Sequence, residues 1–137
     1  MTTLLDLWIP GIPPGKNRRT RMNTKTGRLY TEPSVRAWMA ETALQVRLAR
    51  KGVWKKGMDV QVWVVMHCAD KGAWKWDLDG ALPCLVDAVM AGLMPEDRKR
   101  PPDEYVTHID AWKIRAGNDG ALVQVEVVEE GKEEGHQ

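Results

Sequence analysis

The chain has 137 residues, of which 43% are hydrophobic and 28% charged, and its formal net charge is +1. This composition is typical of one globular domain and argues against a disordered chain or two separate domains. Because no run reaches the roughly 18 apolar residues of a membrane span, and the N-terminus does not resemble a signal peptide, we expect a cytoplasmic protein with no membrane contact.

The first predicted elements are a strand and a helix. Alternation over Leu4 to Pro10 predicts a short strand, which the turn-rich segment Gly11 to Gly15 ends. The basic segment after it is predicted to be a loop. A helix is predicted to begin near Ser34, with Ser34 or Thr31 as its cap, and to end by Gly52. Its apolar positions at helical spacing are Val35, Trp38, Met39, Ala43, Val46 and Leu48 or Ala49.

A central strand and a second helix follow. Met58 to Cys68 alternates at first and then becomes continuously apolar, as a strand in a sheet core does. Pro83 lacks an N–H, so regular helix is predicted to begin near Gly80 or Ala81, and Gly92 and Pro95 are predicted to mark its end. Asp77 and Asp79 are then left in a loop or a first turn. The apolar stripe of this helix is Leu78, Leu82, Leu85, Val89 and Leu93.

Two strands are predicted near the end of the chain, over Tyr105 to Ile114 and Leu122 to Val128. The turn residues 117–120 between them predict a hairpin. The resulting β-α-β-α-β-β order predicts a single α+β domain over residues 1–128, with a mixed sheet and two main helices. Residues 129–137 are expected to be an acidic, disordered tail.

Charge is unevenly distributed along the chain. Residues 124–137 carry five acids against one base, so the body before them is basic. The densest basic stretch runs from Lys16 to Arg21, and no acid occurs between Asp6 and Glu32. A polyanion would be drawn to this stretch, although a solvated loop is the alternative interpretation.

The cysteines are expected to be structural. Cys68 and Cys84 are the only two in the chain, and two buried thiols are expected more often than a disulfide in a cytosolic protein of this size. A zinc site with His67 and His108 is disfavoured, because no closely spaced cysteine or histidine pair would begin it.

Two carboxylates one residue apart, Asp77 and Asp79, stand where the central strand has ended and the second helix begins. One aspartate would suffice to cap a helix, so the second indicates another role. Mg²⁺ prefers carboxylate oxygens and is usually bound by one or two carboxylates together with water and substrate phosphates. Further acids lie within reach along the chain, namely Asp87, Glu96, Asp97 and Asp103.

These motifs together resemble the RusA-like crossover junction endodeoxyribonucleases of bacteria and their phages. The likeness covers roughly residues 4 to 128, and the order and spacing of its motifs are more specific than any one of them. The motifs are Asp77-Leu78-Asp79, Val86-Asp87-Ala88-Val89, Ala91-Gly92-Leu93-Met94-Pro95-Glu96-Asp97, Lys113 on a following strand, and the basic segment Ile9 to Arg18.

The resemblance implies a nuclease that hydrolyses phosphodiester bonds at four-way (Holliday) DNA junctions. Asp77, Asp79 and Asp97 would hold catalytic Mg²⁺, with Mn²⁺ able to substitute and no nucleotide cofactor. Asp97 is favoured as third ligand because no gap separates it from Ala91-Gly92. Asp103 is the alternative, since residues 98–101 look like an insertion. Two symmetric cuts imply a two-fold homodimer.

Nucleic-acid binding is expected from the basic segment and from a lysine beside the acids, with Asp87 in a supporting role. Trp74 and Trp76 would stack on splayed bases or pack in the core. Pro83 stands where many family members have a lysine, so a junction-binding protein that does not cut is the alternative. A nuclease for flaps or single strands is a third. The predicted DNA-binding residues are Lys16, Asn17, Arg18, Arg19, Arg21 and Lys75.

Overall fold

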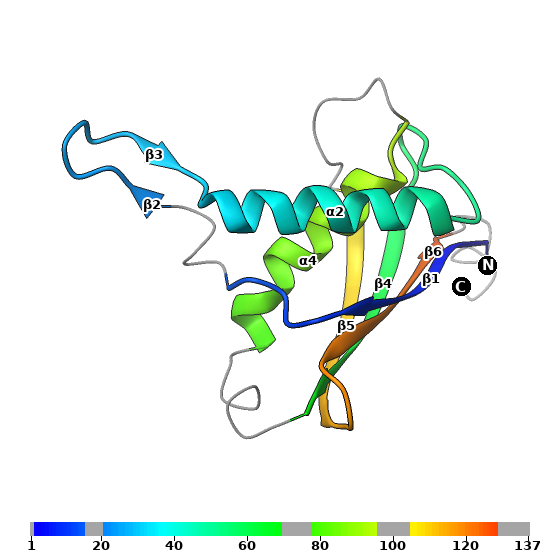
Figure 1. Ribbon diagram of the computed structural model, residues 1–137. Coiled ribbons are helices and arrows are strands. Elements are labelled where there is room, and N and C mark those ends of the chain that lie inside the picture. Colours follow the sequence, from blue (N-terminus) through cyan, green and yellow to red (C-terminus); the bar gives the residue numbers. More distant parts are fainter. Residues whose placement is uncertain (1, 16–20, 70–77, 96–104, 129–137) are drawn as a thin grey trace.

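A mixed sheet of four strands in the order β1-β6-β4-β5 lies beside two helices (Figure 1). The computed structural model describes residues 2–15, 21–69, 78–95 and 105–128. The α+β class, the order of the main elements and the two main helices are confirmed. The strands are β1 (Thr3–Pro10), β4 (Val60–Cys68), β5 (Val106–Arg115) and β6 (Gly120–Val127), and the helices are α2 (Pro33–Ala49) and α4 (Leu78–Leu93).

The predicted hairpin between the last two strands is wrong, because β4 lies between them. β4 pairs in parallel with β5 on one side and antiparallel with β6 on the other. Residues 116–119 therefore cross the end of β4, where the Ala116 N–H donates to the Cys68 carbonyl at 3.2 Å. The Asp119 carboxylate accepts from the Ala69 N–H at 2.7 Å. Four residues can span the two strand spacings of about 10 Å.

One face of the sheet packs against both helices and forms the core. Along β4 the burial alternates strictly, and Val60, Val62, Val64, Met66 and Cys68 are the buried positions. Alternate residues of β1 and β6 join them, together with the inner faces of α2 and α4. The intervening residues point to the opposite face. Within the described segments, no helix covers that second face.

The first turn of α2 differs from the prediction. Its N-cap is Glu32, which makes no capping bond through its side chain, and Pro33 occupies the first helical position. Proline suits that position because its fixed φ is helical and its missing N–H would have had no partner within the helix. Leu48 and Ala49, predicted as core, are exposed, whereas Thr42 is buried. The helix thus turns a slightly different face inward.

α4 begins at Leu78, earlier than the predicted start at Gly80 or Ala81, and Pro83 lies inside it. Pro83 removes only the N–H that would have donated to the Asp79 carbonyl, so the first turn still forms. The helix ends at Leu93, between Gly92 and Pro95, which were predicted to mark its end, and Gly92 is a buried residue of its last turn. A Cβ there would stand 2.5 Å from the Ala43 carbonyl oxygen and from the Val46 Cβ. The glycine therefore allows close approach of α2.

The C-terminal end of α4 is held by hydrogen bonds to its last carbonyls. Helix ends leave four carbonyls without partners inside the helix. Arg50 Nη1 donates to the Gly92 and Met94 carbonyls at 3.0 Å each, and Arg47 Nη2 donates to the Ala91 carbonyl at 3.3 Å. The Trp54 N–H donates to the Leu93 carbonyl at 2.8 Å. α2 and the segment after it thus fix this end of α4.

A short hairpin, β2 (Arg21–Met22) and β3 (Leu29–Tyr30), occupies part of the segment predicted as a loop. It projects from the body of the molecule beyond the start of α2 (Figure 1). The Asn23 side-chain oxygen accepts from the Lys25 N–H at 2.9 Å, and Gly27 takes a φ of +70°. These local bonds give the turn a defined shape.

Two further expectations concern the cysteines and the membrane. Cys68 and Cys84 are buried thiols that no disulfide joins, as predicted. Among the residues that the structure describes, none of the helices has the length and apolar character needed to cross a membrane.

Candidate functional site

An open cavity of about 430 Å³ lies between the first half of α4 and the start of β5. Asp79, Pro83 and Asp87 follow one another at single-turn spacing, so they share one face of the helix. Asp79 is exposed in the first turn, and Asp87 is partly buried. The residues lining the cavity are Asp79, Leu82, Pro83, Val86, Asp87, Val106 and Ile109.

The two carboxylates of this cavity have different positions relative to the helix. Asp79 stands at the N-terminal end, where the positive end of the helix dipole favours an anion. Asp87 is eight residues later, about 12 Å along the axis. Since Mg²⁺ binds oxygens at about 2.0–2.1 Å, the two cannot readily share one ion. Asp79 is therefore the candidate ligand, and Asp87 is a neighbour that shapes the cavity.

Most of the predicted metal ligands lie outside the described residues. Asp77, Asp97 and its alternative Asp103 belong to that group, so the described part of the site consists of Asp79 and its surroundings. Within the ranges 2–15, 21–69, 78–95 and 105–128, no group of three or more histidine, cysteine, aspartate or glutamate residues forms a ready metal centre.

Most of the predicted nucleic-acid contacts also lie outside the described residues, and Arg21 is the exception. The residues outside are Lys16, Asn17, Arg18, Arg19 and Lys75, together with Trp74 and Trp76. The Arg21 Nε lies 3.2 Å from the Glu32 Oε2 at the base of the hairpin, and both side chains are partly exposed. An exposed ion pair of this kind is worth at most about 1 kcal/mol, so a phosphate can compete for the guanidinium.

The β2–β3 hairpin adds features that the sequence interpretation missed. Every residue from 21 to 30 is exposed. Besides the bases Lys25 and Arg28, the hairpin exposes Met22 at 58% and Leu29 at 70%, which face each other in register. The pairing of Arg21-Met22 with Leu29-Tyr30 around an asparagine- and glycine-containing turn could have indicated this hairpin.

A second hollow, of about 340 Å³, connects the start of α2 with the acidic face of α4. Arg36 and Asp87 both line it, with small side chains between them. Arg36 is exposed, and its guanidinium donates to the Thr31 carbonyl at 3.5 Å. Sequence reasoning did not select Arg36, because a single arginine in the first turn of a helix is ordinarily a solvated residue. The structure brings this base and the candidate acids to neighbouring hollows.

Comparison with known proteins adds no family assignment. A scan of the sequence against protein-family models found no match, and a search of curated proteins found none either.

Proposed function

We propose that this chain is a Mg²⁺-dependent endonuclease of the RusA-like type that cuts branched DNA, most simply a four-way junction. The observation that carries the proposal is Asp79. This exposed carboxylate is the second acid of an Asp-x-Asp motif, and it stands at the N-terminal end of α4 on an open cavity. A hard divalent ion needs such oxygen donors and also room for water and a substrate phosphate.

The donor set fits Mg²⁺. Asp79 and Asp77 supply carboxylate oxygen, and the cavity beside Asp79 is open to solvent. When bound, the ion would supply an activated water and would neutralise charge on the phosphate and its leaving oxygen. The contribution of the chain is to hold the Asp79 carboxylate at the N-terminal end of α4 and to position the phosphodiester bond beside it.

The length of chain between each acid and the cavity limits which acid can be the third ligand. Val106 lines the same cavity as Asp79. Asp103 is three residues before Val106, so at most about 11 Å of chain separates Asp103 from Val106. Leu93, at the end of α4, lies about 21 Å from Asp79 along the helix axis. The four residues from Leu93 to Asp97 span at most about 14 Å. Within one copy, the shorter tether favours Asp103, while motif spacing favours Asp97.

Phosphate binding is assigned to the basic residues around the start of α2. Lys25 and Arg28 are exposed on the hairpin, Arg21 lies at its base, and Arg36 lines the hollow that reaches Asp87. Such contacts position a duplex without reading its sequence. Lys16, Asn17, Arg18 and Arg19, which precede Arg21 in the chain, extend the same proposal.

The biological setting belongs to the same proposal. Resolution of a junction needs paired cuts on two strands of like polarity, and a two-fold homodimer supplies two equivalent sites. A cytoplasmic protein of a phage or a prophage that acts in DNA recombination and repair is the setting that the RusA-like motifs imply.

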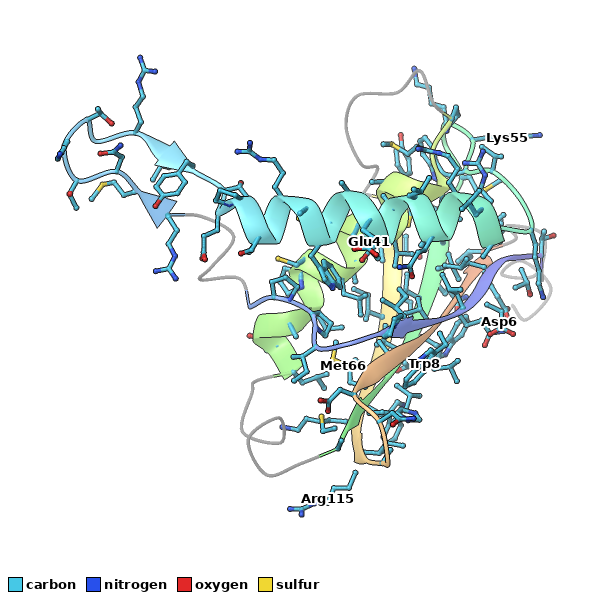
Figure 2. The ribbon with its side chains drawn as sticks, in the orientation of Figure 1. Asp6, Trp8, Glu41, Lys55, Met66 and Arg115 are labelled. Carbon is cyan, nitrogen blue, oxygen red and sulfur yellow. The ribbon has the colours of Figure 1, made fainter. Side chains whose placement is uncertain are left out.

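The direct test is cleavage of a synthetic four-way junction in the presence of Mg²⁺ or Mn²⁺. Loss of an outer partner of a metal ligand typically lowers activity by about 10–100-fold, so loss of the ligand in Asp79→Asn should lower it by at least about 100-fold. Glu41→Gln, an exposed carboxylate-to-amide change on α2, is the matched control (Figure 2). Wild type that leaves the junction intact, or Asp79→Asn that cuts like Glu41→Gln, would falsify the proposal.

A second candidate is a protein that binds junctions without cutting them. Pro83 favours it, because this apolar residue lines the cavity between Asp79 and Asp87, where many RusA-like proteins carry a lysine. Junction binding that weakens with salt, with no Mg²⁺-dependent product, would select this candidate. Preferential cutting of flaps or single strands over four-way junctions would instead select a different nuclease substrate.

A further inference from the structure

The β2–β3 hairpin carries apolar side chains that do not serve the core. Every residue from 21 to 30 is exposed, and none of them belongs to the hydrophobic core. Met22 and Leu29 are each more than half exposed, and Tyr30 is nearly half exposed. Single exposed apolar residues are ordinary on a protein surface, but these three lie together on one short segment. A partner, rather than folding, accounts for their exposure.

The strand pairing brings two of these side chains together on one face of the hairpin. Met22 and Leu29 are directly opposite each other in the antiparallel register, and residues in such a pair project on the same side. Arg21 and Tyr30 form the neighbouring pair, which projects on the other side. Met22 and Leu29 therefore form a single apolar projection, which we call the wedge.

Local hydrogen bonds give the wedge a defined shape before a partner arrives. The Asn23 N–H donates to the Arg28 carbonyl at 2.8 Å, which closes the strand pair next to the wedge. In the turn, the Gly27 N–H donates to the Asn23 carbonyl at 2.8 Å, and the Asn23 side-chain oxygen accepts from the Lys25 N–H at 2.9 Å. A preformed projection loses less entropy on binding than a mobile loop does.

The charge around the wedge indicates an anionic partner. Arg21, Lys25 and Arg28 belong to the same segment, and Glu32 is the first acid that follows them. Glu32 pairs with Arg21 at the base of the hairpin, at 3.2 Å. Apolar wedges accompanied by arginine and lysine are a device with which proteins unstack neighbouring bases in DNA. DNA offers both the phosphates and the apolar base faces that this combination of side chains requires.

A hollow of about 450 Å³ on the hairpin can receive a displaced base. Leu29 lines it, so the hollow is continuous with the wedge. Tyr30 contributes an aromatic ring on which a base can stack, and Asn23 contributes an amide that can bond to the edge of a base. Arg28 also lines the hollow and can contact the phosphate of the same nucleotide.

We infer that the wedge enters the branch point of the bound DNA and unstacks a base there, and that the hollow beside the wedge holds this base. The inference deepens the proposed function and rests on branched DNA as the substrate. Burial of two apolar side chains contributes free energy of the same order as the unstacking of one base step costs. The cost is lowest where pairing is already interrupted, as at a branch.

The wedge gives the protein a means of preferring branched to linear DNA, which contacts to phosphates alone do not provide. The hairpin lies on the same side of the molecule as the first turn of α4, which carries Asp79 (Figure 1). One bound junction can therefore contact both the wedge and the candidate metal ligand.

The fluorescent base 2-aminopurine, whose emission rises when it is unstacked, tests the wedge when it is placed beside the branch point of a synthetic four-way junction. EDTA is present, so the junction is not cut. Wild type should raise the fluorescence on binding, and the double variant Met22→Ala/Leu29→Ala should lose this rise. The affinity of the double variant for the junction should fall about 10–100-fold. Its affinity for linear duplex and its salt dependence should not change, because no phosphate contact is lost.

Two further variants serve as controls. Leu29→Met keeps an apolar side chain of similar size and should keep the rise in fluorescence. Leu48→Ala is the matched leucine-to-alanine change, since Leu48 is 80% exposed near the other end of α2, and it should behave as wild type. All the substituted side chains are exposed, so the variants should fold, which circular dichroism verifies.

The inference is wrong if bound wild type leaves the fluorescence unchanged, or if the double variant raises it as wild type does. An equal loss of affinity for junction and linear duplex also overturns it. If the double variant instead loses binding to vesicles that contain phosphatidylserine, with the junction fluorescence intact, the partner is an anionic membrane and the inference fails.

Cleavage in Mg²⁺ is measured separately, so this inference and the nuclease proposal can fail independently. Wild type that unstacks the branch without cutting it removes the nuclease proposal alone. Wild type that cuts the junction without unstacking it removes the wedge alone, and wild type that does not bind the junction removes both.

Discussion

Arg50 holds the C-terminal end of α4, and its removal should destabilise the fold measurably. Its guanidinium donates to two carbonyls at 3.0 Å, and the contact is partly buried. A hydrogen bond from a charged donor contributes about 1.5–3 kcal/mol, and a cation at a helix C-terminus about 0.3–1 kcal/mol more. Water can reach part of this site in the variant. We therefore expect Arg50→Ala to lower the free energy of unfolding by about 2–3 kcal/mol.

Urea denaturation measures this change as a lower midpoint with an unchanged slope. Arg36→Ala is the matched control: Arg36 is an exposed arginine of the same helix with one long bond of 3.5 Å, and its loss should cost no more than about 0.5 kcal/mol. If Arg50→Ala is no less stable than Arg36→Ala, α4 is not held by these bonds. The result matters for the site, because α4 carries Asp79 and leads into the segment with Asp97 and Asp103.

Three further predictions concern packing, DNA binding and catalysis. Gly92→Ala should lower the free energy of unfolding in urea by about 1–3 kcal/mol, because the added methyl group overpacks against Val46. This loss should exceed the gain of about 1 kcal/mol from the higher helix propensity of alanine. A more stable variant would mean that α2 and α4 move apart at little cost. Arg28→Glu should weaken junction binding. It should also reduce the slope of log affinity against log salt by about 0.9 for each phosphate that the protein no longer neutralises. Lys55 lies far from the hairpin (Figure 2), so Lys55→Glu should leave that slope unchanged. Pro83→Lys should raise the single-turnover cleavage rate by up to about 100-fold if a missing cation limits catalysis, and an unchanged rate would show that it does not.

Local periodicity predicted the elements of this fold well, and contacts distant in sequence account for most of the errors. β4 and α4 each bury one face, so apolar residues alternate along β4 and form a stripe on α4. Both patterns are visible in the sequence alone. The pairing of β6 with β4 does not follow from the turn at 117–120, because the turn is equally compatible with a hairpin. The role of Gly92 likewise depends on α2, more than forty residues earlier in the chain, so glycine was interpreted as a helix stop.

The candidate site could be predicted only as far as its local motif. Asp79 was identified because two acids at a helix start exceed what capping requires, and the structure gives it an exposed position on a cavity. Asp87, selected as an acid within reach of the motif, lines the same cavity. Arg36 was not selected, because its place beside the hollow of Asp87 arises from the crossing of α2 and α4 rather than from chain spacing. The exposed apolar residues of the hairpin were not predicted, because the segment was interpreted as a loop.

The architecture separates two proposed tasks onto two surfaces. The helical side carries the cavity with Asp79, and the hairpin carries exposed bases. Substitutions on separate surfaces generally act independently. Asp79→Asn should therefore abolish cutting while leaving junction binding intact, whereas Arg28→Glu should weaken binding and lower cutting only as far as binding falls. A nuclease needs both surfaces, whereas a junction-binding protein needs only the hairpin, so the Asp79 variant distinguishes these two functions.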